Sequence, residues 1–91
     1  MASDHKDRTV LLSEIQDASR VVSLGSSYCH YKDPNKTYTI LHIAIIEADN
    51  TLCVIYRADY DKDLIFVRPL NNWNEKVPQN GGTVPRFTRV D

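Results

Sequence analysis

The chain has 91 residues, of which 42% are hydrophobic and 25% are charged, and its 11 basic and 12 acidic side chains give a formal net charge of −1. This composition excludes a disordered chain, and the length allows one domain with a modest core. Residues 1–24 carry three basic and four acidic side chains and residues 25–91 carry eight of each, so net charge gives no support to sequence-independent binding of nucleic acid.

The sequence contains no segment of the membrane or secretory type. No apolar run approaches the roughly 20 residues that are needed to cross a bilayer. The first eight residues are polar and mixed in charge, unlike a signal peptide. We therefore expect a cytoplasmic protein without membrane contact. Cys29 and Cys53 are too few for a disulfide-stapled domain and are predicted to be reduced, half-buried thiols.

The first periodic segment predicts a helix at about 9–22. Apolar residues recur at the spacing of one helical face between Leu11 and Val22, and Gly25 stands where a capping glycine is expected. A shorter helix that begins at Ser13 is the alternative, because a serine followed three residues later by a glutamine fits a capping box.

After this segment the hydrophobic period becomes two-fold, which predicts short strands separated by turns. The expected strands are 28–32, 37–46, 52–58 and 64–68, with a final short strand from Pro85. Residues 70–78 are mostly polar, with Trp73 and Val77 as apolar anchors. Turns are expected where Asp, Asn, Pro and Gly gather, at 33–36, 49–50, 61–63 and 80–82.

The longest expected strand, 37–46, is largely apolar on both faces. One face would carry Tyr38, Ile40, His42, Ala44 and Ile46, and the other Thr39, Leu41, Ile43 and Ile45. A strand that is covered on both sides is typical of a small barrel with a helix packed outside. We therefore predict a mainly β fold, with residues 1–24 as an N-terminal extension and residues 25–91 as a small antiparallel β-barrel.

Several short motifs in residues 25–87 occur in an ordered set. They are Tyr28-x-His30-Tyr31-Lys32, Tyr38, Ile43-Ala44, Val54-Ile55-Tyr56-Arg57, Phe66-Val67-Arg68-Pro69-Leu70 and Val84-Pro85-Arg86-Phe87. In order and spacing this set resembles the family known as domain of unknown function 1653, over about two thirds of the chain. The resemblance implies an SH3-like β-roll and no established activity.

The chain departs from the family pattern in three places. Family members typically continue the Ile-Ala pair into a polar stretch with His and Glu, whereas this chain has Ile45 and Ile46 first. The family's usual Trp before Val-Arg-Pro is Phe66 here. The residues before Gly25 lie outside the resemblance, so the predicted helix either covers an apolar surface or forms a dimer contact.

The sequence lacks the spacing signals of a metal site, a cofactor site or a nucleophile. No Cys-x-x-Cys, His-x-x-x-His, Gly-x-Ser-x-Gly or phosphate-binding glycine loop occurs. Asp59, Asp61 and Asp63 have the start of a calcium-loop pattern, but Leu64 and Leu70 stand where that loop needs Gly and Glu. We therefore predict neither metal nor cofactor and read these aspartates as solubilising.

The remaining candidates are polar and aromatic residues near strand ends. The candidate ligand-binding residues are His30, Lys32, Tyr56, Arg57, Arg68 and Arg86. In a groove of a small barrel, aromatic rings can stack on a ligand while arginines pair with carboxylate or phosphate. The alternative is structural: the arginines bond backbone carbonyls or aspartates at strand ends, and the lysine points into water. Trp73 and Tyr31 are predicted to be core residues instead.

Three classes of function compete. The favoured one is a non-catalytic binding module for a small, nucleotide-like ligand, a peptide or a partner protein, a second copy of the chain included. The alternative is a nucleic-acid-binding module, which a one-sided basic surface with exposed tyrosines would favour. An enzyme is the least favoured, because the catalytic motifs are missing and the polar stretch of the family is replaced.

Overall fold

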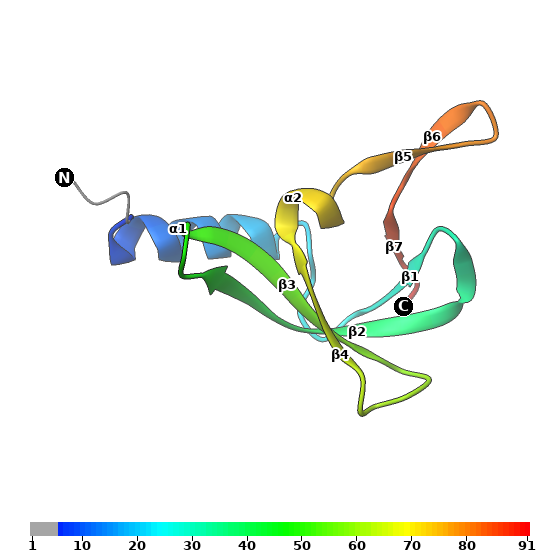
Figure 1. Cartoon of the computed structure of the whole chain (residues 1–91), viewed down its shortest axis with the longest axis horizontal. Helices are drawn as coiled ribbons and strands as arrows, with labels where there is room; N and C mark the ends of the chain where they lie inside the picture. Colours follow the sequence, from blue (N-terminus) through cyan, green and yellow to red (C-terminus); the bar gives the residue numbers. More distant parts are fainter. Residues whose placement is uncertain (1–5) are drawn as a thin grey trace.

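A computed structural model describes residues 6–91, which form a five-stranded sheet, a separate hairpin and two helices (Figure 1). The helices are α1 (Arg8–Ser19) and α2 (Leu70–Trp73). The sheet is formed by β1 (Ser27–His30), β2 (Asp33–Ile46), β3 (Thr51–Ala58), β4 (Ile65–Pro69) and β7 (Phe87–Arg89). The hairpin is formed by β5 (Lys76–Gln79) and β6 (Gly82–Pro85).

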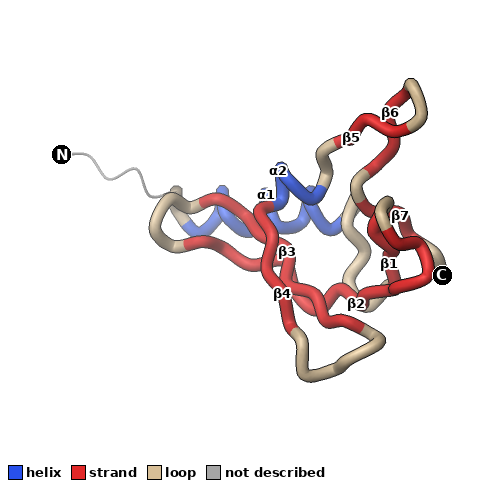
Figure 2. Tube along the Cα trace, turned by 45° about the vertical axis from the view of Figure 1, so that its right-hand side comes forward, coloured by secondary structure: helices blue, strands red, loops and turns tan. Residues whose placement is uncertain are grey.

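The sheet is antiparallel and open. Its order is β4-β3-β2-β1-β7, so β4 and β7 are its two edges. The predicted mainly β class with an N-terminal helix is confirmed, but the prediction of a closed barrel is wrong. The chain between the two edge strands forms α2 and the β5–β6 hairpin, which projects away from the sheet instead of bridging its edges (Figure 2).

Helix α1 is shorter than predicted and packs on the sheet. Asp7 caps its start by accepting a hydrogen bond of 3.0 Å from the Val10 N–H, so neither predicted start is correct in detail. The helix ends at Ser19, and Val22 enters the core from the following turn. The Tyr28 hydroxyl accepts a 2.9 Å hydrogen bond from the Ser23 N–H and so fixes this turn against β1.

A β-bulge divides β2 into two halves that turn different residues toward the core. Between Ile40 and His42 the pairing register with β3 shifts by one residue, which leaves Leu41 as the extra one. Ile40 and Ile43 therefore lie in the same buried cluster, although the unbroken alternation predicts opposite faces for them. His42 is exposed, so it does not share the core face of Ile40.

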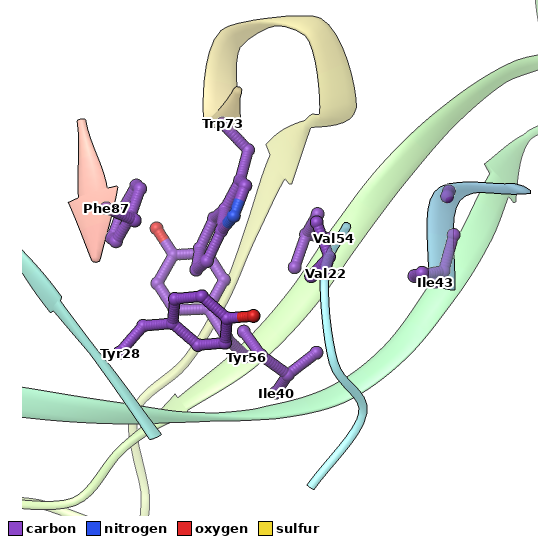
Figure 3. Packing of buried hydrophobic residues seen from close by; sticks show 9 residues of the cluster. Val22, Tyr28, Ile40, Ile43, Val54, Tyr56, Trp73 and Phe87 are labelled. Carbon is purple, nitrogen blue, oxygen red and sulfur yellow. The ribbon is translucent and has the colours of Figure 1, made fainter. Parts of the chain in front are cut away.

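Aromatic rings from four elements form the centre of the core (Figure 3). The ring of Trp73 on α2 stacks on that of Phe87 on β7, with centroids 3.7 Å apart and planes within 3° of parallel. Tyr56 on β3 and Tyr28 on β1 meet the indole edge to face, at centroid distances of 5.0 and 5.6 Å. Trp73 is buried, as predicted, and it connects the short helix to three strands.

One predicted turn contains residues with left-handed backbone conformation, and another lies before its predicted position. Asn80 and Gly81 both have positive φ, 52° and 82°, as the tight β5–β6 hairpin requires. The β1–β2 turn lies at Tyr31 and Lys32, and residues 33–36 belong to β2, where the pairing register with β1 shifts, instead of forming the predicted turn. Tyr31 is therefore a turn residue and not the core residue that we predicted.

The packing of α1 and its following turn makes a matched pair of stability predictions. Val22 is 0% exposed and its neighbour Val21 is 66% exposed. We expect Val22→Ala to lower the free energy of unfolding by about 2 kcal/mol, because it removes buried methyl groups and leaves a cavity. Val21→Ala should change it by less than about 0.5 kcal/mol. Urea denaturation measures both, and equal effects would show that the turn does not pack as described.

Candidate functional site

A small cavity of about 190 Å³ opens on the face of the sheet that carries the aromatic core. Its lining residues come from all five strands of the sheet and are His30, Tyr38, Tyr56, Phe66, Arg68 and Phe87. Alternation explains part of this set, because Tyr56 and Phe66 are paired across β3 and β4 and Arg68 follows two residues after Phe66 on the same face. The cavity therefore has aromatic walls, one guanidinium group and one imidazole ring.

Arg68 supplies the positive charge of the cavity. Its Nε donates to the Tyr56 hydroxyl at 3.4 Å and its Nη1 donates to Oδ1 of Asn72 at 2.6 Å. Its guanidinium carbon lies 5.2 Å from the centroid of the Phe87 ring. Within residues 6–91 no carboxylate forms an ion pair with Arg68. A guanidinium group has five N–H donors, so Arg68 retains donors for a further acceptor.

His30 is held as a neutral donor beside this charge. Its Nδ1 accepts a 3.2 Å hydrogen bond from the Lys32 N–H, which places the proton of the neutral ring on Nε2. Burial lowers the pKa of His30 below 6.5, and the positive charges of Arg68, Arg86 and Lys32 lower it further. The ring lies edge to face against Phe87, with centroids 5.0 Å apart.

Tyr38 contributes a phenol that stays protonated. Burial and a hydrogen bond with the Tyr60 side chain raise the pKa of Tyr38 to about 12. Its ring lies edge to face with those of Tyr56 and Phe66, at 5.5 and 6.3 Å between centroids. The wall of the cavity is therefore made of rings that hold one another in place.

The structure brings three of the six predicted site residues together in this cavity: His30, Tyr56 and Arg68. The other three lie outside its lining. Arg86 donates from Nε to the Asn72 carbonyl at 3.0 Å and from Nη2 to Glu75 at 2.6 Å, so it ties the base of the hairpin to α2. That arrangement is the structural role that we weighed as the alternative for this residue.

Lys32 and Arg57 have other surroundings. Lys32 is exposed, and its Nζ lies 5.9 Å from the centroid of the Tyr31 ring. Arg57 follows Tyr56 on β3, so alternation directs it to the opposite face of the sheet. Burial of the Asp59 carboxyl raises its pKa, but hydrogen bonds from the Thr39 and Thr37 hydroxyls lower it, and so does the positive charge of Arg57. The net effect is a lowered pKa of Asp59.

The sequence did not lead us to predict three of the lining residues as site residues: Tyr38, Phe66 and Phe87. Tyr38 was placed on a core face, and the other two were noted as parts of motifs. The signal that could have found Phe66 is its register opposite Tyr56, since paired residues of neighbouring strands share a face.

The described residues offer little for other chemistry. In residues 6–91 no three His, Cys, Asp or Glu side chains gather in a way that could hold a metal ion. Cys29 and Cys53 are both buried free thiols, more deeply placed than the half-buried thiols we predicted. Neither helix of this region has the length and apolar character needed to span a membrane.

The lowered pKa of His30 predicts a pH effect on stability. The unfolded chain takes up the proton first, so the stabilisation from neutral His30 is present above pH 6.5 and is lost as the pH falls through its lower folded-state pKa. Between pH 7.5 and 5.5, wild-type protein should therefore lose more stability than His30→Gln. His42→Gln, at an exposed histidine, is the control and should lose as much as wild type. Urea titrations at both pH values measure the difference, and identical losses in wild type and His30→Gln would contradict the expected shift.

Comparison with known proteins identifies relatives of the sheet that carries the cavity. The sequence profile of a family described as "Protein of unknown function (DUF1653)" matches residues 26–89, which include all six lining residues and exclude α1. The chain is similar to the crystal structure of a DUF1653 protein from Bordetella bronchiseptica, with 29% sequence identity and a TM-score of 0.64. The similarity covers 84% of this chain and 91% of that chain. No curated protein matches the chain.

Proposed function

The chain belongs to the DUF1653 family, and we propose that it is a non-catalytic binding module whose cavity holds the carboxylate of a small ligand. The observation that carries this proposal is the guanidinium group of Arg68, which faces an aromatic-walled cavity and has no carboxylate partner in residues 6–91. A partly buried positive charge without an acidic partner favours an anionic ligand.

The donors of the cavity fit a carboxylate in number and kind. Arg68 retains N–H donors and neutral His30 carries a proton on Nε2. Lys32 and Arg86 add positive charge near His30, although Arg86 is paired with Glu75. The region around the cavity is therefore more positive than the net charge of the whole chain suggests.

The size and walls of the cavity limit what enters. At about 190 Å³ it is smaller than the roughly 300–1,000 Å³ typical of sites for drug-sized ligands. A small aromatic or branched carboxylic acid fits this volume, and so does the carboxylate end of a peptide. Both share the same chemistry, an acid attached to an apolar body that packs against Phe66 and Phe87.

The lining favours binding over catalysis. Among the residues that the structure describes, the lining contains no Ser, Thr, Cys, Lys, Asp or Glu side chain, so it lacks the nucleophiles that these side chains supply. It also lacks the two carboxyl groups of an acid–base pair. The neutral His30 can donate a hydrogen bond without any chemical step.

The test is an amide NMR titration of labelled protein with benzoate, a blocked peptide with a free C-terminal phenylalanine, the same peptide as its amide, and adenosine monophosphate. We expect shifts clustered on His30, Tyr56 and Arg68 with benzoate or the free-acid peptide and none with the amide. Shifts at these residues with adenosine monophosphate alone would show that the cavity binds a phosphate and not a carboxylate. A silent titration of the folded protein would overturn the proposal.

Arg68 should supply most of the affinity. We expect Arg68→Met to weaken benzoate binding by about 10- to 100-fold, because a hydrogen-bonded charge pair contributes roughly 1.5–3 kcal/mol. Arg89→Met is the matched control, since Arg89 is an exposed arginine on β7 that pairs with Asp91. Isothermal calorimetry measures both variants, and an equal loss in the two would show that general charge, not the cavity, drives binding.

The pH dependence of binding should follow His30. Protonation of His30 adds a second positive charge to the cavity, while a carboxylate with a pKa near 4 stays ionised. Benzoate affinity should therefore rise as the pH falls from 7.5 to 5.5, and the bound anion should raise the pKa of His30 in turn. His30→Gln should bind benzoate with an affinity that changes little over the same range. If the affinity of the wild-type protein for benzoate does not change with pH, His30 does not interact with the ligand.

A further inference from the structure

A second and larger hollow lies at the other end of the sheet, between α1, the turn that joins β2 to β3, and the start of α2. Its volume is about 710 Å³. Figure 1 shows the first half of α1 beside the β2–β3 turn. We call this hollow the helix groove. None of its lining residues belongs to the carboxylate cavity described above.

The floor of the helix groove is apolar. It is formed by Ala18 on α1, Ile46 and Leu52 on the two strands that flank the turn, and Leu70 on α2. Leu52 and Leu70 are partly buried against the core cluster that contains Ala18. The floor is thus an uncovered extension of the core. An aliphatic side chain that binds there removes apolar surface from water, which is favourable for the same reason as the burial of a core residue.

The rim of the helix groove is acidic. Glu14 and Asp17 line it from α1 and Asp49 lines it from the β2–β3 turn, whereas Lys6 is the one basic residue of the lining within residues 6–91. Hydrogen bonds from the hydroxyl and the backbone N–H of Thr51 lower the pKa of Asp49, so this carboxylate stays ionised at neutral pH. Three carboxylates therefore face one ammonium group around the floor.

The chain itself shows how a basic side chain lies on this rim. The Lys6 ammonium group donates to both carboxylate oxygens of Glu14, at 2.9 and 2.8 Å. Asp17 has only a long, exposed pairing of 3.5 Å with Arg20. Asp49 accepts hydrogen bonds from Thr51 and forms no ion pair within residues 6–91. Two of the three rim carboxylates are therefore open to further cations.

We propose that the helix groove binds a short peptide segment of a partner protein that carries aliphatic side chains flanked by lysine or arginine. The apolar floor takes the aliphatic side chains, and Asp17 and Asp49 take the basic ones on opposite sides of it. The volume lies within the range of established ligand sites, which is room for a few side chains. The wall formed by α1 lies outside residues 26–89, whereas Ile46, Asp49, Leu52 and Leu70 lie within them, so the groove forms where α1 meets the part of the chain that the family profile matches.

The probe is the peptide acetyl-Lys-Leu-Lys-Leu-Lys-amide, titrated into the labelled full-length protein and followed by amide NMR shifts. We expect shifts clustered on Asp17, Leu52 and Leu70, and none at the carboxylate cavity. Replacing both leucines of the probe by serine should weaken binding at least about tenfold, because the floor then has nothing apolar to cover. Replacing the lysines by glutamates should abolish it.

Two double variants with the same change in charge separate the groove from general attraction. Asp17→Asn with Asp49→Asn removes the two rim carboxylates that take the basic side chains, and Asp61→Asn with Asp63→Asn removes two from the exposed loop before β4. We expect the first to weaken the probe about fivefold or more and the second to change its affinity less than twofold.

Three results would overturn the proposal. Equal weakening in the two double variants would mean that net charge alone attracts the probe. Binding of hexylamine without binding of the peptide would make the groove a site for small amines. Shifts at Leu52 and Leu70 on dilution of the protein without probe, with a change in sedimentation, would make a second copy of the chain the occupant.

Discussion

The stacking of Trp73 on Phe87 is the contact on which most of the molecule depends. Their rings lie 3.7 Å apart and nearly parallel, and they join the helix after β4 to the last strand across more than a dozen residues of chain. A large aromatic pair of this kind contributes area burial and favourable ring geometry together. Phe87 also forms a wall of the cavity that Arg68 lines, and Arg68 lies over the same ring. The centre of the core and the proposed ligand therefore share one side chain.

The sheet concentrates positive charge in a chain whose formal charge is near zero. Arg68 and Lys32 flank His30 without acidic partners in residues 6–91, whereas Arg86 is held by Glu75. The opposite end of the sheet carries the acidic rim of Glu14, Asp17 and Asp49. This separation arises because β4 and the β1–β2 turn bring Arg68 and Lys32 toward His30, while α1 and the β2–β3 turn carry the acidic residues. The net charge of the chain is the sum over the basic and the acidic region, so it reveals neither of them.

Local patterns in the sequence predicted the strands of the five-stranded sheet and the N-terminal helix, but they did not predict α2, β5 and β6. Contacts between distant residues could not be predicted in the same way. Alternation located β3 well, and Asn80-Gly81 marked the turn between β5 and β6, because both signals depend on neighbouring residues. The bulge at Leu41 has no comparable signal, so the face of Ile43 was predicted wrongly. Likewise Tyr56 and Arg68 were found as polar and aromatic residues of motifs, whereas Phe87 reaches their cavity only through the pairing of β7 with β1.

The open edge at β4 has a consequence for how the chain avoids aggregation. The Ala58 N–H bonds the Leu64 carbonyl, so alternation directs the backbone groups of Ile65 and Val67 away from β3, and these side chains are 58% and 64% exposed. Such an apolar strand is a template for unwanted pairing with other chains. Charged residues of the preceding loop and Pro69 flank it on its two sides. They act as gatekeepers, because charge repels a neighbouring strand and proline cannot extend a ladder.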